Sequence, residues 1–194
     1  MHPYEEIPLN TAGYILGVWL ILVHVWMLTK SDNAMAFLKR LPRNYPFGIA
    51  FMAAGMFWFW LLIIPERVFK SPLAMDLGEF NAAKTALFIL VPIVTYIMID
   101  RVREFLAVRG LGVIALMAAA PLLAAAWMEP APGKLLIPIF SYGLLTAGLF
   151  WVGMPYLFRD AITWAIAKKS RFQALAFAGL TYGIAVLACA LVWW

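Results

Sequence analysis

The hydrophobic residues of this chain are gathered in six long stretches separated by short polar segments. Each stretch holds roughly 16–24 residues, close to the length that a helix needs to cross about 30 Å of hydrocarbon. The pattern therefore predicts an all-α integral membrane protein, a single transmembrane domain over residues 1–194. The six predicted spans are Thr11–Thr29, Phe47–Pro65, Lys84–Ile99, Gly110–Met128, Leu135–Phe158 and Phe172–Trp194.

The composition agrees with a chain that lies almost entirely in the bilayer. Hydrophobic residues make up 65% of the sequence and charged residues 13%, whereas a soluble domain is about half apolar and about a quarter charged. The net charge of +5 could indicate nucleic acid, but basic residues of membrane proteins gather in cytoplasmic loops. We therefore expect the lipid bilayer, and not nucleic acid, as the partner of this surface.

The lysines and arginines are distributed unevenly between the two sides of the predicted bundle. Eleven of the 15 fall in the segments that follow the first, third and fifth stretches, and four fall on the other side. Glu5 and Glu6 precede the first stretch. Because positively charged loops stay in the cytoplasm, we expect both termini on the outer side of a plasma or inner membrane, which is the periplasm in a Gram-negative host.

The three basic inner segments share an order of residue types. Each opens with an aspartate, followed by an aromatic residue and then by basic residues; the aspartates are Asp32, Asp100 and Asp160. This order predicts a short amphipathic helix on the inner surface in each segment. The aspartate would lie at its N-terminal end, where a carboxylate favours the helix dipole, and the aromatic ring would lie in the headgroup layer.

The spans that follow the first two of these segments also resemble each other. The sequence FGIAFMAAG begins at Phe47, and GVIALMAAA begins at Gly112. Such similarity suggests three helical hairpins derived from one unit, all with the same membrane orientation. Chance similarity between helices rich in alanine and leucine is the alternative.

Four pairs of small residues four positions apart stand out, one in each of four spans. Small side chains let helices approach closely in lipid, where no hydrophobic effect drives helices together. We expect these pairs to mark packing faces inside the bundle; an interface with another subunit is the alternative. The pairs are Gly13 with Gly17, Ala50 with Ala54, Ala115 with Ala119, and Gly179 with Gly183.

His24 is the only histidine inside a predicted span. Ionisable groups within a membrane are costly, so they are the first place to look for function. The favoured interpretation is a structural histidine bonded to a neighbouring carbonyl or hydroxyl. The alternatives are an axial ligand of haem or chlorophyll and a contact for a proton or a substrate. A haem held by two histidines of this chain is excluded, because His2 lies in the N-terminal tail.

Common catalytic and metal-binding patterns are missing from the sequence. It contains no paired-histidine motif, no GxSxG sequence and no phosphate-binding glycine loop, so we assign no catalytic and no metal-binding residue. The three inner aspartates would bind a cation or a phosphate only if the hairpins packed around a shared axis. Helix capping and charge balance explain them more simply.

These observations favour a non-catalytic membrane subunit or scaffold of a larger respiratory or photosynthetic assembly, in contact with other subunits or with itself. The scarcity of polar groups within the spans and the many aromatic and small residues support this expectation. The first alternative is a transporter of a small solute or a lipid. The second is a haem- or chlorophyll-binding membrane protein that uses His24. An enzyme is the least favoured class.

Overall fold

The computed structural model describes residues 6–65 and 74–194 of the chain, and within them it contains only helices and connecting turns. Six of the helices are long and apolar enough to cross a membrane, which confirms the all-helical fold with six such elements. They are α1 (Leu9–Thr29), α3 (Tyr45–Leu62), α4 (Lys84–Arg101), α5 (Leu106–Ala125), α6 (Leu136–Gly153) and α8 (Lys169–Val192). Two shorter helices are α2 (Ser31–Arg40) and α7 (Tyr156–Ile166).

The fifth predicted span is longer than the helix that the structure contains. The hydrophobic stretch continues to Phe158, but α6 ends at Gly153 and a new helix, α7, begins at Tyr156. Pro155 stands at the start of α7. Because proline has no N–H group, it ends the hydrogen-bonding pattern of one helix and is tolerated at the first turn of the next.

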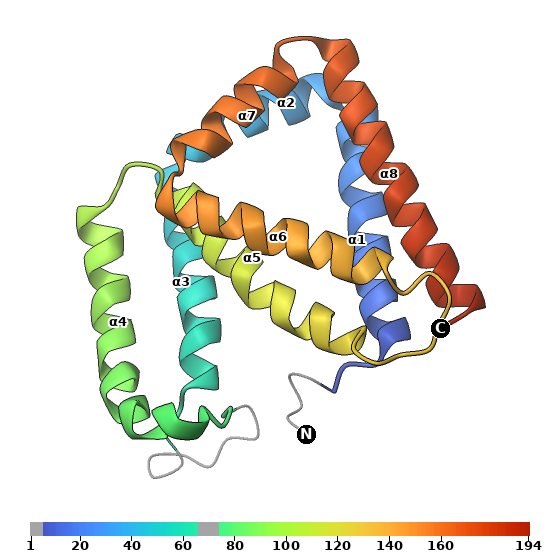
Figure 1. Cartoon of the computed structure of the whole chain (residues 1–194). Coiled ribbons are helices and arrows are strands. Elements are labelled where there is room, and N and C mark those ends of the chain that lie inside the picture. The colour runs from blue at the N-terminus through green and yellow to red at the C-terminus, as the bar shows by residue number, and fades with distance from the viewer. Residues whose placement is uncertain (1–5, 66–73) are drawn as a thin grey trace.

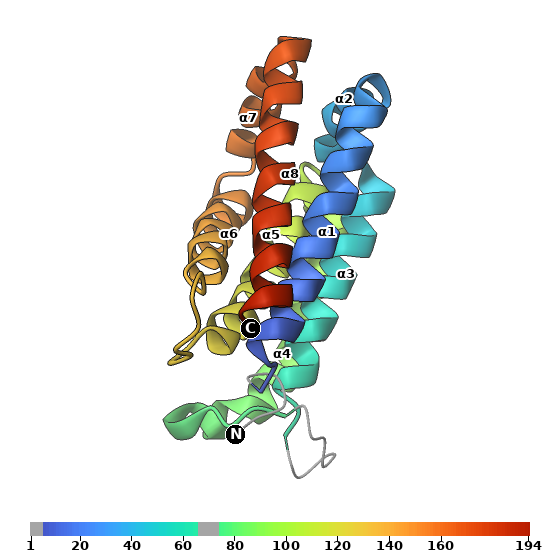
Figure 2. The same cartoon turned by 90° about the vertical axis from the view of Figure 1, so that its right-hand side faces the viewer.

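The long helices form two groups (Figure 1). The short helices α2 and α7 join them at one end, and at the other end Leu9 and Leu16 of α1 share a buried cluster with Ala126 and Ile137 at the α5–α6 connection. In one group, α1 and α8 pack along each other, as Figure 2 shows from the side. In the other group, α5 packs between α3 and α6. Helix α4 packs mainly against α3. The two helices that flank each inner segment, such as α1 and α3, do not pack along each other. The predicted hairpins are therefore not packing units, and the internal repeat stays a prediction.

The short helices α2 and α7 contact each other and cross the same end of the molecule, which we call the α2–α7 end (Figure 1). They carry the chain sideways from one helix group to the other. The second inner segment, which contains Asp100, differs from the expectation, because residues 102–105 form a short turn and not a surface helix. In that turn Phe105 adopts the left-handed conformation, with φ of 56°. The start of α1 and the end of α8 lie at the opposite end.

The centre of the second group depends on close backbone contact at glycines of α5. A Cβ atom on Gly110 would lie 2.5 Å from the amide nitrogen of Met52 in α3. A Cβ atom on Gly112 would lie 2.9 Å from the carbonyl oxygen of Gly148 in α6. Any side chain at these positions would push the helices apart, so α5 lies close to both neighbours because it carries glycine there.

Helix α4 is attached to α3 near both of its ends. The rings of Trp60 and Phe88 stack with centroids 4.6 Å apart, and Trp60 Nε1 donates a hydrogen bond to the Phe88 carbonyl at 2.9 Å. Nearer the α2–α7 end, the Tyr45 hydroxyl donates to the Ile99 carbonyl at 2.9 Å. Most other side chains of α4 are exposed.

Candidate functional site

In the interface between α1 and α8, glycines of each helix pack against a larger residue of the other helix. A Cβ atom on Gly17 would lie 2.9 Å from Leu187 Cβ, and one on Gly183 would lie 2.8 Å from Leu20 Cβ. Residue numbers rise along α1 as they fall along α8, so the two helices are antiparallel. The structure thus brings the glycine pairs of the first and last spans together inside one chain.

His24 occupies the next place in this interface. Its Nδ1 lies 2.7 Å from the carbonyl oxygen of Leu20, one turn earlier in α1. A carbonyl oxygen only accepts, so Nδ1 is the donor, and in the neutral ring Nε2 is left as an acceptor. The bond to Leu20 is of the kind that the structural interpretation of His24 expects. The haem and chlorophyll interpretation stays a prediction.

The imidazole of His24 lies flat against the backbone of Gly179 in α8. A Cβ atom on Gly179 would lie 2.0 Å from Nε2, 2.4 Å from Cδ2 and 2.5 Å from Cε1. A point in line with the Nε2 lone pair would be much farther from the two carbons than from Nε2. The near-equal distances therefore place this point over the face of the ring. The lone pair of Nε2 lies in the ring plane and is not directed at α8.

His24 lines an open groove between the α1–α8 pair and α6, which we call the His24 groove. Its volume is about 490 Å³, and its lining includes Leu20, His24, Phe140, Gly143, Gly179 and Tyr182. The Tyr182 hydroxyl donates to the Leu136 carbonyl at 2.5 Å. Its ring lies beside that of Phe140, with centroids 6.4 Å apart. One imidazole nitrogen is thus presented in surroundings that are otherwise mostly apolar.

A second groove, which we call the Trp19 groove, lies between α1 and the helices α3, α5 and α6. It has a volume of about 550 Å³, and its lining includes Leu16, Trp19, Trp58, Ala118, Leu122 and Trp151. Phe140 and Leu144 line both grooves. Within the described part of the chain, no lysine, arginine, aspartate or glutamate lines either one. The two grooves therefore form neighbouring apolar spaces between the two helix groups.

The small-residue pairs of the second and fourth spans have different positions. Ala115 and Ala119 are buried in α5. Ala50 and Ala54, by contrast, are exposed, so the expectation that they pack inside the bundle does not hold for this chain. The face of α3 that meets α5 carries Gly48, Met52 and Gly55 instead. Position 50 lies 200° around the helix from position 48, at 100° per residue, so Ala50 and Ala54 share the opposite side.

The three inner aspartates lie in three different settings. Asp32 is in the first turn of α2, as expected, and pairs with Lys169 of α8 at 2.8 Å. Asp160 lies in the second turn of α7 and pairs with Arg159 at 2.8 Å. None of the three accepts a capping hydrogen bond. Among residues 6–65 and 74–194, no group of three or more His, Cys, Asp or Glu side chains comes together to hold a metal ion.

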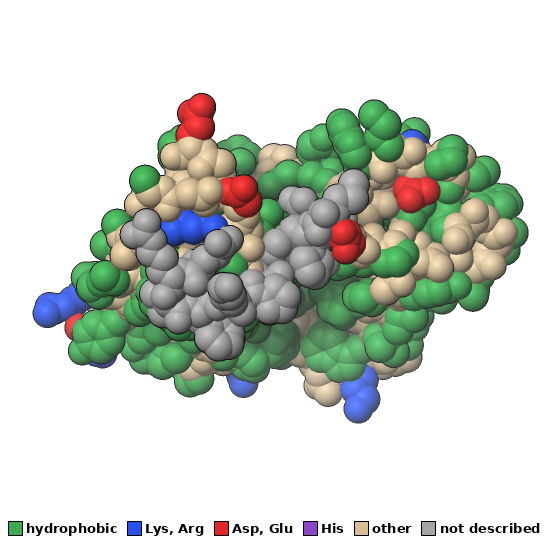
Figure 3. All heavy atoms as spheres, turned by 90° about the horizontal axis from the view of Figure 1, so that it is seen from below, with side chains coloured by type: hydrophobic (Ala, Val, Ile, Leu, Met, Phe, Trp, Pro, Cys, Tyr) green, Lys and Arg blue, Asp and Glu red, His purple; other side chains and the backbone are tan. Residues whose placement is uncertain are grey.

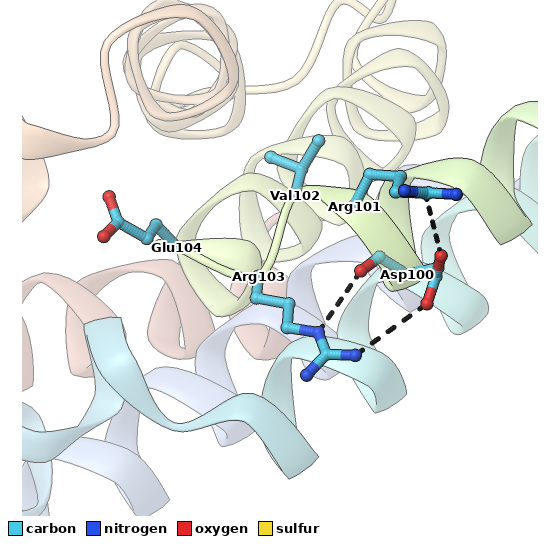
Figure 4. Close-up of a pocket in the computed structure, with 5 residues that line it drawn as sticks. All are labelled: Asp100, Arg101, Val102, Arg103 and Glu104. Atoms are coloured by element: carbon cyan, nitrogen blue, oxygen red, sulfur yellow. Dashed lines mark hydrogen bonds and ion pairs between the residues drawn. The ribbon is translucent and has the colours of Figure 1, made fainter.

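The expectation for the second inner segment is corrected at Asp100, because this residue lies at the C-terminal end of α4 and no surface helix follows it. Its carboxylate accepts from Arg101 Nε at 3.0 Å and lies 3.8 Å from Arg103 Nη2. Figure 4 shows both arginines turned toward Asp100 and Glu104 turned away from it. The open hollow of about 510 Å³ here is lined by residues 100–104 alone. It is a charge-balanced turn of exposed side chains.

Arg109 is one of the eleven basic residues of the inner segments, but the sequence did not predict its contact with α6. It begins the second turn of α5 and donates from Nη1 to the Val152 carbonyl, at 2.7 Å, where α6 ends. A cation at this position favours the negative end of the α6 dipole. Its Nε is buried without a hydrogen-bond partner in the described residues. Gly110, Gly112 and Gly148 were also missed as contact positions, because no small residue stands four positions before or after any of them.

Comparisons with known proteins assign no family to this fold. No protein-family model matches the chain, and searches of curated proteins and of solved structures found no match. What the protein does has to be inferred from the grooves and the side chains around them.

Proposed function

We propose that this is an integral membrane protein that binds a lipid-like molecule between its two helix groups and acts as its carrier or transporter. The observation that supports this most directly is the Trp19 groove, a space of about 550 Å³ lined by aliphatic and aromatic side chains from four helices. Its volume lies within the usual range of about 300–1,000 Å³ for small-molecule sites.

The groove has the length of a chain that fills one leaflet. Its lining on α5 extends from Leu111 to Leu122, which is about 16 Å at a helical rise of 1.5 Å per residue. This is about half of the hydrocarbon thickness of a bilayer. An acyl or other hydrocarbon chain would meet apolar side chains along this whole path, and no charge would be desolvated when it enters.

The same proposal places the α2–α7 end in the cytoplasm, in a plasma or inner membrane. Lys39, Arg40, Lys168 and Arg171 lie on or beside the two surface helices of this end. Seen from the opposite end, where α1 begins and α8 ends, the charged side chains of the described residues are scattered among apolar ones (Figure 3). Basic residues favour the cytoplasmic side, and both termini then lie outside.

Native mass spectrometry of the protein purified in a mild detergent would test the proposed binding. We expect at least one lipid molecule to remain bound per chain. The variant Ala118→Phe fills the Trp19 groove and should lower the retained fraction severalfold. The control Ala86→Phe adds the same ring to the exposed side of α4 and should retain lipid like the parent. Equal retention by all three proteins would contradict the proposal.

As a second candidate we propose a non-catalytic subunit of a larger membrane assembly, respiratory or photosynthetic. Helix α4 favours it, because Lys84 and Val91 are its only buried residues and α3 is its main neighbour. A helix with so little support inside its own chain offers a long face to another membrane protein. Purification from the native membrane followed by protein mass spectrometry would test this. A stoichiometric partner is expected, and isolation of the chain alone would count against it.

A further inference from the structure

We infer that the His24 groove binds the headgroup of a neutral lipid with a hydroxyl group, whose O–H donates a hydrogen bond to His24 Nε2. This inference rests on the proposed lipid-binding function and names the class of lipid. It concerns the polar end of the molecule, whereas the Trp19 groove would hold its apolar chain.

The first argument is that Nε2 is an acceptor in apolar surroundings. Its partner nitrogen, Nδ1, donates to Leu20 O, so Nε2 can only accept while the ring is neutral. A polar atom that leaves water without a hydrogen bond costs free energy. A ligand that supplies a donor at this atom therefore gains an interaction that hydrocarbon alone cannot offer.

The second argument is that Tyr182, which lines the groove, and the hydroxyl groups on the adjoining turns of α6 and α8 already donate elsewhere. Tyr182 donates to the Leu136 carbonyl at 2.5 Å, Ser141 to the Ile137 carbonyl at 2.8 Å, and Thr181 to the Ala178 carbonyl at 2.8 Å. Each hydroxyl has one proton. None of these three hydroxyl groups can donate a hydrogen bond to Nε2 without losing the bond that it already makes. The donor therefore has to come from the ligand.

The third argument concerns charge and the number of polar atoms. Within the described residues, the groove presents His24 and Tyr182 as its only side chains with polar atoms. A phosphate or carboxylate would be desolvated here without a cation to compensate it. An amide would bring a carbonyl that needs a donor, and the groove offers none. A hydroxyl satisfies Nε2 with a single donor and leaves no unpaired charge.

The fourth argument is the space beside the ring. A Cβ atom on Gly143 would have no other atom within 4 Å. Ala147 and Ala178 also line the groove, and their small side chains leave space beside the ring. Phe140 and Leu144 line both this space and the Trp19 groove, so the two spaces are neighbours. A hydroxyl at His24 and a hydrocarbon chain along α5 are therefore compatible with one continuous molecule.

The test uses a matched pair of probes, 1-dodecanol and dodecyl methyl ether, which differ in the ability to donate. The protein is labelled with ¹⁵N-histidine and carries His2→Asn, so that His24 gives the only imidazole signals. It is reconstituted in phosphatidylcholine nanodiscs, whose lipid has no hydroxyl donor. We expect 1-dodecanol to shift the Nε2 resonance upfield in a saturable way and the ether to leave it unchanged. The variant Gly143→Leu, which fills the open space, should abolish the shift.

A second measurement separates this inference from the proposed function. Native mass spectrometry reports whether 1-dodecanol stays bound, and His24→Phe should weaken its retention by about two- to tenfold, the value of one hydrogen bond. Retention that Ala118→Phe lowers, without any Nε2 shift, would overturn the hydroxyl inference and leave the lipid-binding proposal standing. Identical Nε2 shifts with the two probes would also overturn it. Loss of retention in every protein, the parent included, would overturn both.

Discussion

The imidazole of His24 lies face-on against Gly179, so that a Cβ atom on this glycine would stand 2.0 Å from Nε2. The two residues are far apart in the sequence and belong to the first and last long helices. Their contact fixes the ring at the edge of the His24 groove. Position 179 has to be glycine as long as His24 is present, because a Cβ atom there would overlap the imidazole ring.

The first prediction follows from this contact. Gly179→Ala should displace the imidazole and destabilise the protein by about 1–3 kcal/mol, the usual cost of overpacking. The free energy of unfolding in mixed micelles would measure it. Gly143→Ala is the matched control, since a Cβ there meets open space, and it should change the stability little. Equal effects of the two substitutions would show that the helix backbone, and not the contact with His24, responds to the added methyl group.

The second prediction concerns the role of the glycines of α1. Gly17 receives Leu187 of the same chain, so Gly17→Leu should destabilise the isolated protein itself. Val18→Leu adds bulk at the next, exposed position and should be tolerated. Thermal denaturation of the two purified variants would compare them. A stable Gly17→Leu protein that has lost only a partner protein would instead favour the subunit-interface interpretation of this pair.

The third prediction concerns the attachment of α4. Trp60→Phe keeps a ring that stacks on Phe88 but removes the donor to the Phe88 carbonyl, which should cost about 0.5–1.5 kcal/mol. Trp60→Ala removes both interactions and should let α4 move away from α3. Distances between spin labels on the two helices would then spread over a wider range. Ile89→Ala alters an exposed side chain of α4 and serves as the control with an unchanged distribution.

The fourth prediction concerns pH. Hydrogen bonds from the Asn81 side chain and from the Gly78 N–H lower the pKa of Asp76 below its ordinary value of 3.8. A lowered pKa in the folded protein means that the ionised carboxylate stabilises this turn above pH 3.8, and that the contribution is lost as the pH falls through the lower, folded value. The Gly78 amide resonance should therefore titrate with a midpoint below 3.8. The step should vanish in Asp76→Asn, and a midpoint above 3.8 would contradict the assignment.

The fifth prediction concerns orientation. In a Cys189→Ala background, Ala82→Cys lies at the end where α1 begins and α8 ends, and it should react with an impermeant maleimide added to intact cells or spheroplasts. Lys39→Cys lies at the α2–α7 end and should react only after lysis. The reverse pattern would place the basic helices outside and contradict the orientation derived from the charges.

The number of long helices and the grouping of the basic segments could be predicted from the sequence. A span needs about 20 apolar residues wherever it packs, so length and hydrophobicity are enough to detect it. For the same reason the charged residues lie in the connections or near the ends of the long helices. Gly17 and Gly183 could also be recognised as contact positions, because a small residue in a long apolar helix signals close approach in lipid.

The partner of each helix was decided only by the tertiary structure. A small residue shows that something comes close without showing what, so Ala50 and Gly48 could not be told apart before α5 was seen to lie on one side of α3. The surface helix expected after Asp100 is a turn, because residues 102–105 leave too few positions for a helix between α4 and α5. The neighbour of His24 lies in the last helix, and contacts across such a sequence separation leave no local pattern. For this reason the sequence could identify His24 as a candidate residue, whereas the groove beside it is a property of the assembled helices.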